Sequence, residues 1–165
     1  MLPLGVVGRT KFRAYGAFAL LVINIVVFLW ELMLMARGQA VFMEAIATYA
    51  MNVCAVGVEP LPVIGRNLIL SMFLHGSLAH LAGNMLFLWI FAPRVEAYLG
   101  HRRFIVFYLL AGLAASAAHW LFGGVVCSPT QPYAGLAIGA SGAIAGVMGA
   151  FLFLHPGLRI ETAFM

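Results

Sequence analysis

Four stretches of this chain stay mostly apolar for about 20 residues or more, and this pattern constrains the fold more than any other feature. They cover residues 15–36, 68–92, 104–126 and 135–154. A helix that crosses the hydrocarbon core of a bilayer needs about 20 such residues. Hydrophobic residues make up 64% of the chain and charged residues 8%, whereas soluble domains carry about 45–50% and about 25%. The sequence therefore predicts an all-α, polytopic transmembrane helical bundle of about four spans.

The second apolar stretch is longer than one span requires and is interrupted by Gly76 and Ser77. We expect residues 68–74 to form a short re-entrant or interfacial segment. The span itself then begins at Leu78, with Ser77 as its N-cap. The preceding connection, residues 37–67, is long enough to be partly inserted in the membrane, and we expect a short interfacial helix over residues 43–49.

The basic residues are distributed unevenly between the two ends of the predicted spans. If the N-terminus is cytoplasmic, the outer flanks carry only Arg37 and Arg66. The inner flanks carry the other seven of the nine basic residues: Arg9, Lys11, Arg13, Arg94, Arg102, Arg103 and Arg159. Positive charge concentrates in cytoplasmic loops, so both termini are expected to be cytoplasmic. This distribution accounts for the basic pI of 9.5 without a nucleic-acid partner.

Two polar residues at the predicted outer end of the second span, His80 and Asn84, form a candidate site. Their i, i+4 spacing places both side chains on one helix face. They are suited to donate hydrogen bonds to a developing oxyanion, or alternatively to join two helices by hydrogen bonds. His75 precedes the helix break, and by itself it is more typical of an interfacial histidine than of a catalytic one.

A serine among small residues, Ser141, lies near the outer start of the fourth stretch. Two adjacent rows of small residues begin there, and such rows usually mark close helix packing. The position of Ser141 nevertheless favours a shared, water-accessible pocket with His80 and Asn84. His119, near the outer end of the third stretch, is a candidate base, although a lone histidine there is more often explained by packing.

The two cysteines, Cys54 and Cys127, lie outside the long apolar stretches and on the same predicted outer face. Neither belongs to a CxxC pair or to a Cys/His spacing typical of a metal site. The sequence indicates no metal and no cofactor. Pairing of the two cysteines in an oxidising compartment is one reading, and the sequence leaves it open.

Two motifs resemble those of the rhomboid family of intramembrane serine proteases. Residues 75–85 read HGSLAHLAGNM, which resembles the family signature HxxxxHxxxN, and residues 139–144 read GASGAI, which resembles the nucleophile motif. Between them, residues 95–100 resemble the cytoplasmic turn of the family and residues 107–112 its third span. The resemblance covers residues 68–156 in the expected order.

The resemblance implies a role for each candidate residue. Ser141 corresponds to the nucleophile, and His80 and Asn84, with the Ser141 backbone N–H, correspond to the oxyanion hole. The positions of His75, Gly139 and Gly142 are supporting ones. The family uses a Ser-His dyad without aspartate, and this chain contains no aspartate.

The implied activity is that of an intramembrane serine endopeptidase. Such enzymes cleave transmembrane proteins near their outer ends and use no cofactor. The expected partners are transmembrane protein substrates and the lipid bilayer. The expected location is a bacterial inner membrane, in a multi-pass arrangement.

The chain departs from the family pattern in two places. Residues Arg66 and Asn67 stand where the family usually has a Trp-Arg pair. The general base of the family is a histidine on a later span, in a GxxxAHxxG-like stretch, and no residue here matches it. We therefore expect the fragment to be inactive, and the alternative is a catalytically dead rhomboid-like protein that binds transmembrane helices.

The expected organisation follows from the spans and the resemblance together. Residues 1–14 form a cytoplasmic tail and residues 15–36 the first span. Residues 37–67 form the outer loop, residues 68–156 a rhomboid-like core, and residues 157–165 a truncated cytoplasmic end. A small transporter or channel component is disfavoured, because it predicts an internal repeat or further ionisable residues near the bilayer centre.

Overall fold

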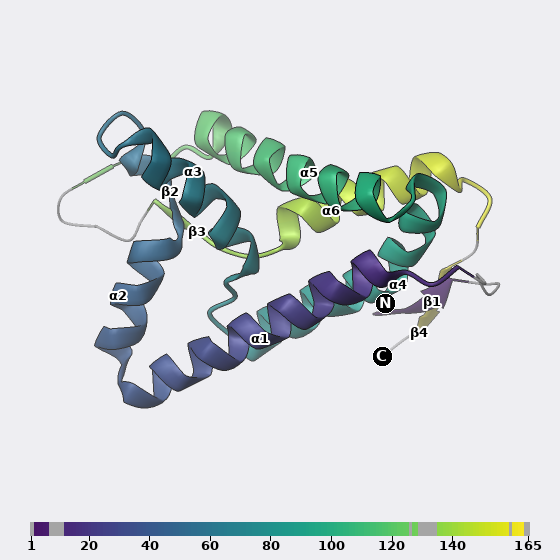
Figure 1. Cartoon of the computed structure of the whole chain (residues 1–165), viewed down its shortest axis with the longest axis horizontal. Helices are drawn as coiled ribbons and strands as arrows, with labels where there is room; N and C mark the ends of the chain where they lie inside the picture. The colour runs from purple at the N-terminus through teal and green to yellow at the C-terminus, as the bar shows by residue number, and fades with distance from the viewer. Residues whose placement is uncertain (1, 7–11, 126, 129–134, 159, 164–165) are drawn as a thin grey trace.

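The computed structural model describes residues 2–6, 12–125, 127–128, 135–158 and 160–163. Within this part the chain is mainly helical, with two short strand pairs (Figure 1). The α-helices are α1 (Tyr15–Arg37), α2 (Gln39–Tyr49), α3 (Leu61–Leu70), α4 (Leu78–Leu99), α5 (His101–Phe122) and α6 (Ser141–Leu154). The 3-10 turns are η1 (Val53–Ala55) and η2 (Ser71–Phe73), and the strands are β1 (Leu2–Val6), β2 (Met51–Asn52), β3 (Leu136–Ala137) and β4 (Ile160–Ala163).

Three helices, α1, α4 and α5, are long and apolar enough to cross a bilayer. They correspond to the first three predicted spans. The prediction that the second span begins at Leu78 is confirmed. Ser77 is its N-cap, because the Ser77 side chain accepts the backbone N–H of His80 at 3.2 Å. The fold is therefore the helical membrane bundle that the sequence predicts.

The fourth apolar stretch differs from the prediction, because it is helical only from Ser141 to Leu154. Gly139 has a φ of +117°, which lies outside the helical region, and its backbone N–H bonds the Ser71 carbonyl at 2.8 Å. Fourteen helical residues extend about 21 Å, which is less than the ~30 Å hydrocarbon core. Helix α6 packs against α4 and α5, and its start lies part-way along α5 rather than level with the C-terminal end of α5 (Figure 1). Ser141 is the first residue of α6 and therefore lies within the bundle.

Small residues allow α6 to approach α5 closely. A Cβ atom added to Gly142 would lie 2.5 Å from the Cβ of Ala115, and one added to Gly146 would lie 2.5 Å from the Cβ of Ala111. The predicted row of small residues that contains Gly142 and Gly146 thus packs on α5. The other row, formed by Ser141, Ala145 and Gly149, is exposed in the described part of the chain.

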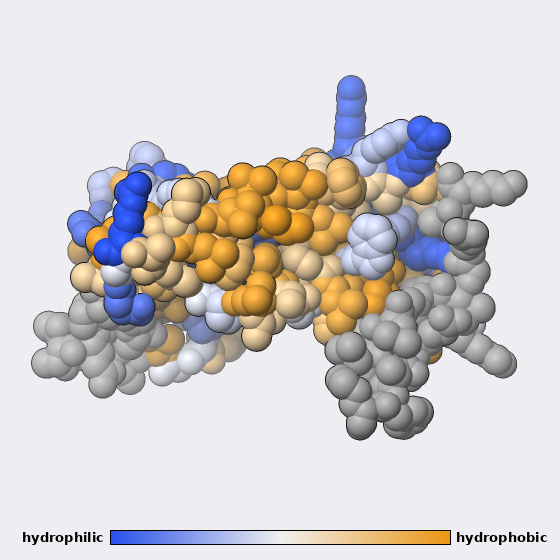
Figure 2. All heavy atoms as spheres, turned by 90° about the horizontal axis from the view of Figure 1, so that it is seen from below, coloured by the Kyte–Doolittle hydropathy of each residue, from blue (hydrophilic) through white to orange (hydrophobic). Residues whose placement is uncertain are grey.

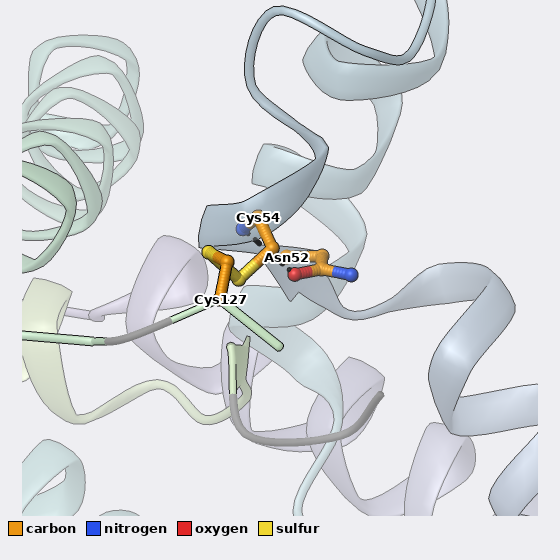
Figure 3. The surroundings of a disulfide bond; sticks show 3 residues. All are labelled: Asn52, Cys54 and Cys127. Atoms are coloured by element: carbon orange, nitrogen blue, oxygen red, sulfur yellow. Dashed lines mark hydrogen bonds between the residues drawn. A yellow bond between two sulfur atoms is a disulfide. The ribbon is translucent and has the colours of Figure 1, made fainter. Parts of the chain in front are cut away.

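The outer loop is ordered by helices and by a disulfide. The short helix predicted over residues 43–49 is present and longer than expected, as α2. Cys54 and Cys127 are joined, with their Cα atoms 5.6 Å apart (Figure 3). Beside this bond, the Asn52 side chain accepts the N–H of Cys54 at 2.9 Å, and β2 pairs antiparallel with β3. The disulfide therefore connects the outer loop to the segment that leads into α6.

At the opposite end of the bundle, Glu96 holds three helices together. Its buried carboxylate accepts the backbone N–H groups of Gly16 and Ala17, each at 2.7 Å, and contacts the His101 ring. Helix α1 has no side-chain N-cap of its own, so Glu96 supplies the acceptor that its first turn needs. Strands β1 and β4 pair nearby, which brings the two tails together (Figure 1).

The surface shows an apolar band between polar ends. Figure 2 views the molecule from below and shows orange side chains across the middle, with blue groups towards both ends. Helix α1 exposes many large apolar residues to this surface, including Phe18, Val22, Val26 and Leu29. An apolar outer surface of this kind suits lipid as the surrounding solvent.

Two glycines of α6 provide a matched test of its packing on α5. Gly146→Ala should lower the stability by about 1–3 kcal/mol, because the added methyl forces the helices apart. Gly149→Ala has no atom within 4 Å of the added carbon, so it should raise the stability by up to about 1 kcal/mol through helix propensity. Thermal unfolding in detergent micelles, followed by circular dichroism, measures both. Equal effects of the two substitutions would contradict this packing.

Replacing Glu96 tests its role at the start of α1. Glu96→Ala should destabilise the protein by about 1–3 kcal/mol for each buried N–H that it leaves without an acceptor. Glu96→Gln should cost less, because one acceptor oxygen remains. The exposed Glu44 of α2 serves as the control, since Glu44→Ala should change the unfolding temperature little. Similar unfolding temperatures for the Glu96→Ala and Glu44→Ala variants would show that the contact is unimportant.

Candidate active site

Three polar side chains at the start of α4 form one hydrogen-bonded cluster. The His75 Nδ1 lies 3.1 Å from the Phe73 carbonyl oxygen, and the His80 Nδ1 lies 2.9 Å from the His75 carbonyl oxygen. A carbonyl only accepts, so both Nδ1 atoms carry the proton. The Asn84 amide nitrogen then donates to the His75 Nε2, 3.0 Å away.

His75 is buried inside the bundle. Its side chain is only 1% exposed, and its ring packs edge-on against the ring of His80. The chain turns at Gly76, where φ is +62°, so His75 is not part of α4, which begins at Leu78. The turn brings His75 back over the first turn of α4, where it orients Asn84 and His80.

Gly139 is the point at which this cluster meets the segment before Ser141. A Cβ atom at Gly139 would lie 2.7 Å from the His80 Nε2 and 3.6 Å from the Asn84 amide nitrogen. Both side chains therefore face Gly139, on one face of α4 as their spacing predicts. Glycine is required here because the backbone has a positive φ and the His80 ring occupies the space of a side chain.

Ser141 is the first residue of α6 and is exposed. It lines a cavity of about 210 Å³ together with Gly139, Ser71, Ser116 and the other residues that close it: Met72, Gly112, Ala115, His119, Ala137, Ile138, Gly142 and Ala143. The cavity thus contains the serine and, on α5, the exposed His119. His80 and Asn84, which the sequence predicts to share a pocket with Ser141, are not among its lining residues. A hydroxyl and an imidazole in one hollow are the groups that nucleophilic catalysis requires.

The first turn of α6 adds a favourable electrostatic environment. The first N–H groups of an α-helix have no acceptor within the helix, and the helix dipole favours negative charge at that end. The Ser141 backbone N–H belongs to this first turn and follows Gly139, the residue that the His80 Nε2 and the Asn84 amide both face. When His80 also carries a proton on Nε2, all three groups donate, and together they suit an oxyanion.

Gly142 lines the Ser141 cavity, and a larger cavity lies elsewhere along α5. Gly142 faces Ala115 on α5, so its contribution to the site is the close approach of the two helices. A cavity of about 630 Å³ lies between the outer loop and α5, where Arg66, Asn67 and Trp120 are among its lining residues. Arg66 bonds the Thr48 carbonyl there and anchors α3 to α2.

One residue that contacts the cluster was not identified from the sequence as part of a site. Glu31 of α1 is 0% exposed and accepts the backbone N–H of His75. An ionisable residue within an apolar span is itself a signal of function, and that signal was available in the sequence. Within the described residues, no group of three or more His, Cys, Asp or Glu is placed to hold a metal ion.

The buried state of His75 predicts a specific pH dependence. Burial lowers the pKa of His75 from its usual value of about 6.5 to about 4. Between these values the unfolded chain binds the proton and the folded chain does not. The contribution of His75 to the free energy of unfolding is therefore complete above about pH 6.5 and decreases as the pH falls towards 4.

His75→Asn isolates this contribution from that of the carboxylates. The difference in unfolding temperature between wild type and variant should narrow as the pH is lowered from about 6.5 to 4. Thermal unfolding in micelles at half-unit pH steps measures the difference. A constant difference over this range would show that His75 is not buried as a neutral ring.

The comparisons with known proteins agree with these motifs. The model of the Rhomboid domain matches residues 65–165. The mitochondrial presenilin-associated rhomboid-like protein of Rattus norvegicus is 36% identical over 103 residues, which are 62% of this chain and 26% of the relative. The rhomboid protease GluP of Bacillus subtilis is 40% identical over 87 residues, 53% of this chain and 15% of the relative.

A further relative is the putative rhomboid protease YdcA of Bacillus subtilis, 34% identical over 87 residues, which cover 53% of this chain and 40% of the relative. No solved structure matches the chain. The chain spans about a quarter of the length of the presenilin-associated relatives that it matches and 15% of GluP. The domain match covers more than half of the chain, and the chain therefore belongs to the rhomboid family.

Proposed function

We propose that this chain carries the nucleophile and the oxyanion-stabilising groups of an intramembrane serine endopeptidase. The observation that carries the proposal is the convergence of His80 and Asn84 on Gly139, two residues before Ser141 at the start of α6. A serine that begins a helix, two residues after a glycine that two polar side chains face, suits acyl transfer. Membership of a family that includes named rhomboid proteases supports the same chemistry.

In this mechanism the Ser141 oxygen attacks the carbonyl carbon of a peptide bond in a transmembrane substrate. The hydroxyl proton passes to a base, and the carbonyl electrons move to the oxygen, which becomes an oxyanion. The Ser141 N–H, the Asn84 amide and a protonated His80 donate to that oxygen. The amine then leaves with the proton, and water releases the acyl group from Ser141.

The general base has two candidates. The rhomboid resemblance places it on a span beyond the stretch that matches here. Within this chain, His119 lines the same cavity as Ser141, which makes it the candidate that the geometry favours. If His119 is the base, a His119 variant loses the reactivity of Ser141. If the base lies on another span, the variant keeps it.

The position of Ser141 supports a transmembrane helix as the substrate. The exposed row of Ser141, Ala145 and Gly149 lets a second helix approach the nucleophile closely. We propose that a substrate helix lies along this row and unwinds near Ser141, with the cavity supplying water. The uneven distribution of basic residues supports a cytoplasmic N-terminus and a site near the opposite membrane surface.

The same exposed row also supports a second function. A chain that presents small residues on an open helix face and lacks an effective base binds transmembrane helices without cleaving them. The mitochondrial relatives are named only rhomboid-like, so family membership is compatible with either function.

Labelling of native membranes with a fluorophosphonate tests the proposal. An activated serine displaces fluoride from the phosphorus, so the probe reports the nucleophile directly. We expect labelling that is lost in Ser141→Ala and retained in Ser116→Ala, since Ser116 lines the same cavity. A labelled mass above 17.8 kDa would place the base on a downstream span.

Labelling at 17.8 kDa that falls at least about 100-fold in His119→Gln would identify His119 as the base, within the usual range for loss of a general base. No labelling, or labelling that survives Ser141→Ala, would overturn the endopeptidase proposal. Helix binding would then be the better account of the chain.

A further inference from the structure

Glu31 is a fully buried carboxylate in the later part of α1, and the proposed mechanism does not use it. Each of its oxygens accepts the backbone N–H of His75 at 3.0 Å, and Oε1 also accepts the N–H of Gly76 at 3.3 Å. A carboxylate within an apolar span is costly unless its oxygens are satisfied. The partners that satisfy Glu31 are backbone groups of the turn before α4.

This turn binds the carboxylate as other short turns bind anions. Successive backbone N–H groups that point into one concavity form an anion site, and here the anion belongs to the protein itself. Gly76 adopts a φ of +62°, which allows the two N–H groups to converge. Glu31 thereby fixes the backbone between η2 and α4 from a different helix.

The His75–Gly76 peptide unit connects Glu31 to the His80 ring. Its N–H donates to Glu31 Oε1, and its carbonyl oxygen accepts the His80 Nδ1–H at 2.9 Å. The peptide is planar, and its N–H and C=O point in opposite directions. A rotation of this unit would therefore break both hydrogen bonds together, and bonds in such a chain polarise one another.

We propose that Glu31 is a positioning residue for the oxyanion side of the Ser141 site and acts on His80 through the His75–Gly76 peptide. This inference rests on the proposed function. With Nδ1–H held by the His75 carbonyl, the His80 ring directs Nε2 at Gly139. Glu31, the peptide and His80 thus resemble the orienting group and imidazole of a triad, with a peptide unit between them.

Two substitutions of Glu31 separate orientation from folding. Glu31→Gln keeps the size of the side chain but leaves one acceptor oxygen, so it cannot accept all three contacts. Glu31→Ala removes the acceptor entirely. Glu44→Gln is the matched control, because Glu44 is an exposed carboxylate of α2. If Glu31→Ala does not fold, Glu31→Gln still provides the test.

The first readout is nuclear magnetic resonance of the full chain in micelles with ¹⁵N-labelled histidine. The His80 signals are assigned by their loss in His80→Gln. We expect a single Nδ1–H form of His80 in wild type and Glu44→Gln, and a mixture of both tautomers in the Glu31 variants. The amide protons of His75 and Gly76 should exchange with solvent at least about tenfold faster in those variants.

The second readout is the rate of Ser141 labelling by the fluorophosphonate in native membranes. Glu31→Gln should slow labelling by about 10–100-fold, less than the loss of a whole oxyanion donor, and Glu44→Gln should not change it. If wild-type Ser141 is not labelled, the proposed function fails, and the tautomer of His80 still decides the role of Glu31. Retention of one His80 tautomer in Glu31→Gln, even with a lower unfolding temperature, would overturn the inference and leave Glu31 a purely structural role.

Discussion

Lipid offers no hydrogen-bond partner to a backbone N–H group, and two buried carboxylates meet this constraint at opposite ends of the bundle. Glu96 accepts the N–H groups that begin α1, and Glu31 accepts those of the turn before α4. Each carboxylate comes from a different helix than the N–H groups it binds. The two contacts therefore set both the local backbone and the relative position of α1 and α4.

The position of Ser141 depends on how closely two helices approach. Gly142 and Gly146 leave room for Ala115 and Ala111 of α5, which places α6 inside the bundle. The non-helical backbone at Gly139 then delays the start of α6 until Ser141. As a result, the serine lies on the first turn of a helix, where free N–H groups and the helix dipole favour a negative charge.

The candidate site combines residues whose individual properties are ordinary for a membrane bundle. A histidine and an asparagine on one helix face often serve only to join helices, and a serine among small residues usually packs. The function proposed for them rests on two observations. His80 and Asn84 both face Gly139, and Ser141 lines the same cavity as His119. The disulfide fixes the outer loop to the segment that leads to this point.

The sequence by itself determined the features that depend on local pattern. Apolar runs specified the three long helices, Ser77 marked the start of α4, and the i, i+4 spacing placed His80 and Asn84 on one face. The motifs that resemble the rhomboid family indicated Ser141 as the candidate nucleophile. These predictions rest on the helical period and on the length of a span, which neighbouring residues alone define.

Only the tertiary structure decided the features that join distant segments. In the structure His75 is buried, the helix of the fourth apolar stretch begins only at Ser141, and Cys54 is bonded to Cys127, 73 residues away in the chain. The tertiary structure also gave Glu31 its partners, 44 and 45 residues away in the chain. A sequence shows that a carboxylate lies within an apolar helix, but its hydrogen-bond partners depend on how the helices pack, and no local pattern encodes that packing.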